Sequence, residues 1–214
     1  MNWNKFRIVG LLIAVVFGLV GCGGGGGSDS ASNINSNTSN LADTGPLAKY
    51  AGTWMQGCSN HYRETAIITV SNNGTTLTYE SKDEYFANKD CTGSVVATGT
   101  YDKPASIIQY NETVNNASVK LLTGATATTT VEKVTSNRTG AVIRYVGSGV
   151  TSSNVVGTKT ITHINYIGGS IDLTVDNASG GGQGALSLLN GEMLVLDPVN
   201  YSSSSFVVLN RYIR

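Results

Sequence analysis

The feature that most constrains the fold is an alternation of apolar and polar residues with a period of two. In "TAIITVSNNGTTLTYE" the side chains of Ala66, Ile68 and Val70 fall on one face of an extended chain, and the alternation resumes with Leu77 and Tyr79. Between them stands Asn73-Gly74, and both residue types readily adopt the positive φ that a tight hairpin turn requires. The segment therefore predicts a β-hairpin.

The same pattern recurs in "GALSLLNGEMLVLD", where Asn190-Gly191 separates two alternating stretches. A first strand is expected to begin at Gly52, after a short helix near Leu47–Ala51. The other strands are predicted at residues 94–101, 106–110, 118–122, 125–133, 141–146, 158–166, 171–175 and 205–212.

Composition agrees with a β protein. Ser, Thr, Asn and Gly are abundant, and all four disfavour helix interiors. No repeat at a solenoid or propeller period is visible. We predict an all-β domain, a single antiparallel barrel or sandwich of about 8 to 10 strands. The glycine run at residues 178–185 lacks the Gly-Lys-Ser/Thr ending of a phosphate-binding loop, so a flexible connection is expected there.

The N-terminus has the pattern of an export signal. Lys5 and Arg7 form a short basic region, and Ile8–Val20 is an apolar or glycine run. This run is shorter than the roughly 20 residues that an ordinary membrane-spanning helix needs.

The end of that run, Leu19-Val20-Gly21-Cys22, resembles the lipobox of bacterial lipoproteins. The resemblance implies a signal peptide over 1–21, cleavage before Cys22 and palmitate-type acylation of that cysteine. The Gly-, Ser- and Asn-rich tract that follows has almost nothing to bury, so we expect a lipidated Cys22 and a flexible linker over 22–45 and a folded domain over 46–214. Gly23 stands where aspartate would favour inner-membrane retention, so we expect an outer-membrane anchor on the periplasmic side, with the cell surface and the inner membrane as alternatives.

The two remaining cysteines, Cys58 and Cys91, are an even pair in an exported domain and predict a disulfide. His61 follows Cys58 closely, but no second Cys or His group completes a metal-ligand set, so neither a metal nor a cofactor is expected. Fourteen basic and fourteen acidic residues leave no net charge to attract nucleic acid. Oligomeric state is not indicated.

The start of the domain supplies a second resemblance. Gly52-Thr53-Trp54 is similar to the Gly-x-Trp motif of lipocalins and lipocalin-like lipoprotein barrels. That resemblance implies that Trp54 closes one end of a barrel under a basic residue of the last strand, for which Arg211 is the candidate. The Thr-Asp-Tyr signature of true lipocalins does not occur.

No catalytic set is evident. His163 lies in a predicted strand, and no Gly-x-Ser-x-Gly elbow occurs. The acidic pairs Asp83/Glu84 and Asp172/Asp176 are interpreted as solvated surface groups. We therefore expect no enzyme, but a binding domain for a small apolar ligand or an envelope partner. The alternatives are a structural, envelope-stress or enzyme-inhibitor lipoprotein and a hydrolase, which would need a histidine bonded to a serine and an acid in a cleft.

Overall fold

The computed structural model describes residues 45–71, 73–200 and 204–214, so the lipobox and Cys22 lie outside the described residues. Within these ranges no helix is long and apolar enough to cross a membrane. The described chain forms one 3-10 turn and thirteen strands, which confirms the all-β class. The elements are η1 (Ala48–Tyr50), β1 (Gly52–Gln56), β2 (Tyr62–Val70), β3 (Thr76–Phe86), β4 (Val95–Tyr101), β5 (Ser106–Lys120), β6 (Thr126–Arg138), β7 (Ile143–Val146), β8 (Val150–Val156), β9 (Lys159–Tyr166), β10 (Gly169–Asp176), β11 (Gly180–Leu189), β12 (Glu192–Pro198) and β13 (Ser205–Ile213).

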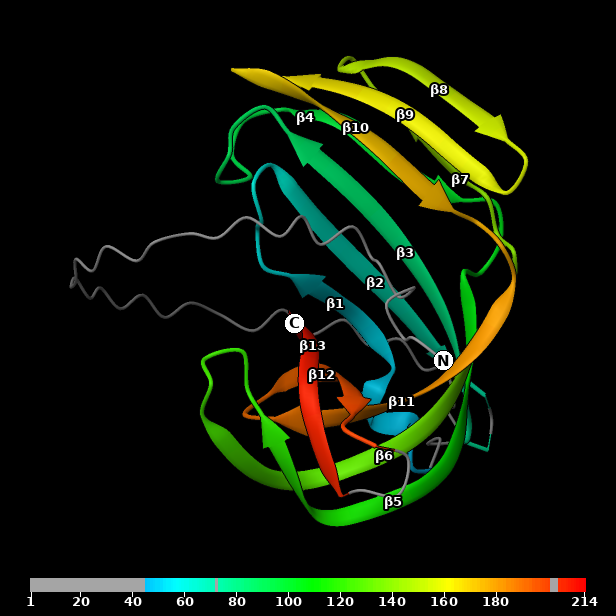
Figure 1. The fold of residues 1–214 in the computed structure, drawn as a ribbon, viewed down its shortest axis with the longest axis vertical. Coiled ribbons are helices and arrows are strands. Elements are labelled where there is room, and N and C mark those ends of the chain that lie inside the picture. Colours follow the sequence, from blue (N-terminus) through cyan, green and yellow to red (C-terminus); the bar gives the residue numbers. More distant parts are fainter. Residues whose placement is uncertain (1–44, 72, 201–203) are drawn as a thin grey trace, which may run out of the picture.

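Eight of the strands form a ring of antiparallel pairings (Figure 1). The ring runs β1-β2-β3-β5-β6-β11-β12-β13 and returns to β1, so neighbouring strands follow one another in chain order as in an up-and-down barrel. The ring is not evenly closed. The β1–β13 seam consists of Met55 opposite Ile213 and Gln56 opposite Tyr212, and β3 meets β5 only over Thr76–Tyr79.

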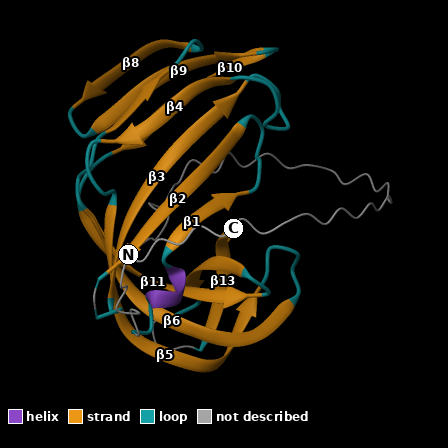
Figure 2. Ribbon diagram, turned by 180° about the vertical axis from the view of Figure 1, so that it is seen from behind, coloured by secondary structure: helices purple, strands orange, loops and turns teal. Residues whose placement is uncertain are grey.

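The other five strands are insertions into this ring. β4 stands between β3 and β5 in the chain, and β7 to β10 stand between β6 and β11. The second half of β3 stays paired with β2 but exchanges β5 for β4 on its other side, and β4 pairs in turn with β7. A separate three-stranded sheet, β8-β9-β10, lies next to this extension (Figure 2) and buries Ile164 and Leu173 against it. The insertions thus form an upper lobe beside the ring.

Trp54 is 1% exposed and packs with Leu47 and Tyr50, at η1, in one buried core cluster. The indole Nε1 donates to the carbonyl of Tyr50 at 2.8 Å. The cation over the Trp54 ring is Arg214, at 4.2 Å, rather than the expected Arg211. The period of two explains the difference, because buried Tyr212 faces inward and its neighbour Arg211 faces outward to Glu192.

Both predicted hairpins are present, β2–β3 and β11–β12, and Asn190 and Gly191 have positive φ in the second turn. Three local expectations were wrong. Residues 106–120 form one long strand with two register irregularities rather than two strands. The glycine run begins β11, which pairs with β6 from Gly180 onward, and β8 is a strand that the sequence pattern did not predict.

The predicted disulfide between Cys58 and Cys91 is confirmed, with a Cα–Cα distance of 5.7 Å. It joins the connection between β1 and β2 to the connection between β3 and β4. The bond therefore holds the ring to the start of the upper lobe.

Candidate functional site

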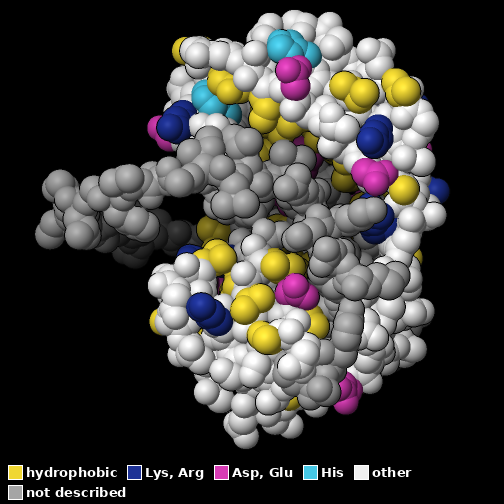
Figure 3. Space-filling view, viewed as in Figure 1, with side chains coloured by type: hydrophobic (Ala, Val, Ile, Leu, Met, Phe, Trp, Pro, Cys, Tyr) yellow, Lys and Arg dark blue, Asp and Glu magenta, His cyan; other side chains and the backbone are white. Residues whose placement is uncertain are grey.

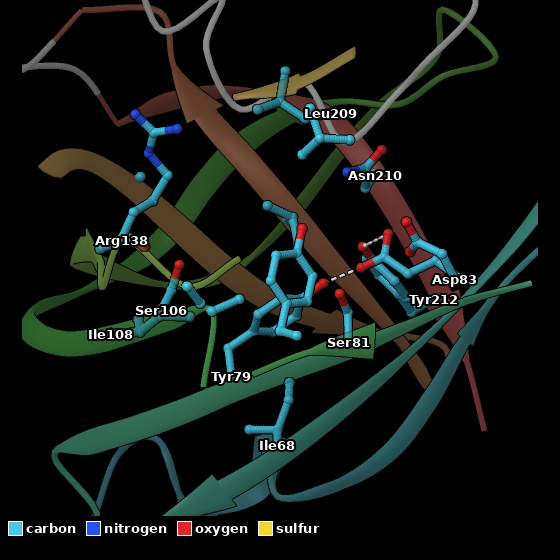
Figure 4. Close-up of a pocket in the computed structure, with 18 of the residues that line it drawn as sticks. Ile68, Tyr79, Ser81, Asp83, Ser106, Ile108, Arg138, Leu209, Asn210 and Tyr212 are labelled. Carbon is cyan, nitrogen blue, oxygen red and sulfur yellow. Dashed lines mark hydrogen bonds between the residues drawn. The ribbon is translucent and has the colours of Figure 1, made fainter. Parts of the chain in front are cut away.

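A cavity of about 300 Å³ lies where the ring meets the inserted strands (Figure 4). Its walls come from ring strands and from the connections into and out of the insertions, at residues 140–141 and 174–178. Most of the lining is apolar. The aliphatic lining residues include Ile68, Ile108, Val134, Leu186, Met193 and Leu196. A cavity of this size and character is at the lower end of the range that small-molecule sites occupy.

Two carboxyl groups stand together in one wall of this cavity. Glu64 on β2 is directly opposite Asp83 on β3, and both side chains point to the inside of the ring. Glu64 is 1% exposed and Asp83 is 7% exposed. Directly opposed residues on antiparallel strands have Cβ atoms about 5 Å apart, so the two carboxyl groups are close neighbours.

Four tyrosine hydroxyls donate to these two carboxyl groups. Tyr79 and Tyr212 donate to the two oxygens of Glu64, the latter at 3.2 Å. On Asp83, the donors are Tyr62 at 3.1 Å and Tyr145 at 2.7 Å. The tyrosines come from β2, β3, β7 and β13, so the cluster ties the ring to the inserted strands.

Gly99 on β4 makes one of these contacts possible. Asp83, Gly99 and Tyr145 are aligned in register across β3, β4 and β7. The Tyr145 ring lies over Gly99 to reach Asp83, and a Cβ atom on Gly99 would be only 2.4 Å from that ring. Glycine is therefore required at this position for steric reasons.

Burial controls the protonation of the pair. It raises the pKa of Glu64 to about 8, the negative charge of Asp83 adds to this, and the tyrosine hydrogen bonds oppose it. Burial also raises the pKa of Asp83, to about 6, against the opposing hydrogen bonds from Tyr145 and Tyr62. Near neutral pH, Glu64 therefore holds a proton while most of the Asp83 population is ionised.

A further polar group in the lining has no partner. Ser136 on β6 is 5% exposed, and its Oγ makes no hydrogen bond with any described residue. Buried hydroxyls are nearly always hydrogen-bonded, because an unpaired one costs about 1 to 3 kcal/mol. Ser136 is also among the residues that line the cavity.

The cavity also has a cationic side. Arg138, at the end of β6, lies across the site from Asp83 in Figure 4. Its Nη1 donates to the carbonyl of Asp176 at 3.3 Å. The lining therefore runs from an acidic, tyrosine-rich wall through an aliphatic middle to a single guanidinium group.

The structure separates the two histidines from this cavity. His61 is buried beside the disulfide, stacks on Tyr166 at 3.8 Å, and its Nδ1 lies 2.9 Å from the carbonyl of Phe86. His163 lies on the exposed three-stranded sheet with Nδ1 2.6 Å from Asp172 and Nε2 3.2 Å from Asn165. Neither ring is among the residues that line the cavity.

Two expectations for the acidic residues have different outcomes. Asp172 and Asp176 are exposed, as expected. The expectation that Asp83 is solvated was wrong, whereas its neighbour Glu84 lies on the opposite face with Lys82 and Arg63. The alternation places Leu77 and Tyr79 on the inner face of β3, and continuing it along the strand places Asp83 on the same face. This pattern could have predicted that Asp83 points inward.

Metal and charge features elsewhere are weak. In the described ranges no group of three or more His, Cys, Asp or Glu residues is arranged to hold a metal ion. On the face in Figure 3 the charged side chains are scattered, and apolar side chains gather over the lower lobe near β12 and β13. Leu209 and Ile213 of β13 are exposed apolar residues.

Sequence reasoning did not single out Glu64, Ser136 or Gly99. Glu64 lies two residues before Ala66, so the period of two predicts that its side chain points inward. Its pairing with Asp83 depends on the register of the hairpin, which the pattern does not give. Ser136 and Gly99 carried no local signal, because their roles depend on strands distant in the chain. No protein-family model, curated protein or solved structure matches this chain.

Proposed function

We propose that the domain binds a small, largely apolar molecule in the cavity between the ring and the inserted strands. The observation that carries this proposal is the cavity of about 300 Å³, with its aliphatic lining and a few polar groups at fixed positions. Small-molecule sites have this composition, in which apolar area contributes affinity and a few polar groups set orientation.

We propose that the domain binds this molecule and does not convert it chemically. Both carboxyl groups of the cavity wall accept hydrogen bonds from tyrosines on separate strands, which fixes them in place. His163 is bonded to an acid, but it lies on an exposed sheet and forms no described hydrogen bond with a serine side chain. These contacts favour a binding role over a hydrolase.

A cavity-filling substitution tests the site. Ile108 and Ile107 are neighbours on β5, and only Ile108 lines the cavity. We expect Ile108→Trp to abolish binding of the neutral fluorescent probe N-phenyl-1-naphthylamine, while Ile107→Trp retains it. Circular dichroism would confirm that both variants fold. Retained binding in Ile108→Trp, or no binding by the unmodified protein, would contradict the proposal.

We also propose that the protein is an outer-membrane lipoprotein anchored through Cys22, with the domain on the periplasmic side. The support is the match of residues 19–22 to the lipobox pattern and the apolar run before it. Stable anchoring requires more than one acyl chain, which a lipidated N-terminal cysteine supplies. Cys22→Ser should leave the precursor unprocessed and unlabelled by radioactive palmitate, whereas normal maturation would exclude this anchor.

Binding of an envelope partner is the second candidate, and β8 favours it. This strand is an edge of the three-stranded sheet, and residues 151–156 are all exposed. Exposed edge strands can accept a strand from another chain. A deletion strain with altered envelope permeability, together with an empty cavity in purified protein, would favour this structural role over ligand binding.

A further inference from the structure

The acidic pair in the cavity wall lacks something that the other buried acid has. Glu132 on β6 is 2% exposed and pairs with Lys49 at 2.7 Å. Glu64 and Asp83 are just as enclosed, yet neither forms an ion pair in the part of the chain that the structure describes. Buried acids are normally paired with a cation or kept neutral; burial keeps Glu64 neutral near pH 7, but most of Asp83 is ionised there without a cation.

Hydrogen bonding leaves the pair with spare capacity to accept. In ionised Asp83 each carboxylate oxygen has two lone pairs and receives one tyrosine hydroxyl, and Glu64 gains the same capacity when it loses its proton. The wall is therefore rich in acceptors, and what would complete it is a group that brings N–H donors and positive charge. Tyr62, Tyr79, Tyr101 and Tyr212 also line the cavity, and the faces of aromatic rings attract cations.

A second observation independently points to a ligand in this space. Ser136 is a lining residue, it is 5% exposed, and its Oγ has no hydrogen-bond partner among the described residues. A ligand with a second polar atom would supply this hydroxyl with a partner. The guanidinium of Arg138 lies across the cavity, so positive charge on a ligand is favoured at the Glu64 wall.

We propose that the cavity binds an amine with an apolar body, its ammonium group at Glu64 and Asp83 and a second polar atom at Ser136. The inference rests on the proposed function, since it names the ligand class of the same cavity. The apolar body would lie along Ile68, Ile108 and Leu186. The other charged groups in the lining are Arg138 and Asp176.

Three ligands with one apolar body test the charge preference. We expect n-octylamine to displace N-phenyl-1-naphthylamine from the full-length protein at about tenfold lower concentration than n-octanol, because charge-assisted hydrogen bonds are the stronger kind. Octanoate should bind more weakly than either. Glu64→Gln and Asp83→Asn should remove the preference for the amine. Glu84→Gln is the matched control, because Glu84 is on the same strand but faces away from the cavity.

Proton release gives a readout that needs no variant. The ammonium group favours the ionised form of Glu64, so calorimetry of n-octylamine binding near pH 7 in buffers of different ionisation enthalpy should show release of up to about one proton. Binding of n-octanol should release none. An amino alcohol of the same length should bind more tightly than n-octylamine, and Ser136→Ala should remove that gain.

The outcomes separate the two proposals. Equal affinity for the amine and the alcohol, unchanged in Glu64→Gln and without proton release, would overturn the amine preference and leave small-molecule binding in place. Failure of the amine, the alcohol and the neutral probe to bind would overturn both. Loss of the amine preference in the Glu84→Gln control as well would show that it does not arise from the cavity wall.

Discussion

One hydrogen bond of the acidic pair depends on a neighbouring residue that has no side chain. The hydroxyl of Tyr145 reaches Asp83 only because Gly99 has no side chain beneath the ring, and the bond is short at 2.7 Å. This one contact links β7, an inserted strand, to β3, a ring strand. A change of a single methyl group at Gly99 therefore acts on the cavity wall as well as on packing.

Gly99→Ala should lower the free energy of unfolding by about 2 to 4 kcal/mol. The new Cβ displaces the Tyr145 ring, and Asp83 then loses a donor while it stays buried. Urea denaturation would measure the change. Gly57→Ala is the control, because a Cβ atom at Gly57 would meet nothing within 4 Å, and it should change stability by less than about 0.5 kcal/mol. Equal effects in the two variants would contradict this account.

At the scale of elements, the local pattern of β2–β3 and β11–β12 is predictable because an Asn-Gly turn fixes each hairpin between alternating strands. The disulfide follows from the cysteine count. The seams β1–β13 and β3–β5 are not predictable in this way, because they join segments far apart in the chain. For the same reason, the sequence predicts that the Glu64 side chain points inward, but it does not predict that Glu64 lines a cavity together with Ser136.

The disulfide stabilises the junction between ring and insertions. Cys58→Ser should lower the free energy of unfolding by about 3 to 4 kcal/mol, because the bond closes a loop with a sequence separation of 33 and restricts the unfolded chain. Cys91→Ser should have the same effect, and Thr92→Ser, an exposed neighbour, almost none. An unchanged urea midpoint in both cysteine variants, or free thiols in the oxidised protein, would argue against this role.

At the scale of the whole molecule, the acidic cavity wall is where the ring and the upper lobe meet. Tyr212 belongs to the last ring strand and Tyr145 to an insertion, and both donate to this wall. The ring has only short seams at β1–β13 and β3–β5, so these side-chain contacts add cross-links that the strand pairing does not provide. The protonation of two carboxyl groups therefore affects the stability of the fold as a whole.

This arrangement predicts that the folded protein loses stability as the pH rises. Folding raises the pKa of Glu64 from 4.5 to about 8 and that of Asp83 from 3.8 to about 6, so the native state holds protons that the unfolded chain has released. Their stabilisation is complete below about pH 4 and is lost as the pH rises through these values. We expect the free energy of unfolding to fall by on the order of 5 kcal/mol between about pH 5 and about pH 9, most of it from Glu64. Glu64→Gln should flatten most of this slope, and Glu84→Gln should preserve it. Urea denaturation across the pH range would check the sign, and a flat or rising profile in the unmodified protein would exclude a buried, proton-holding Glu64.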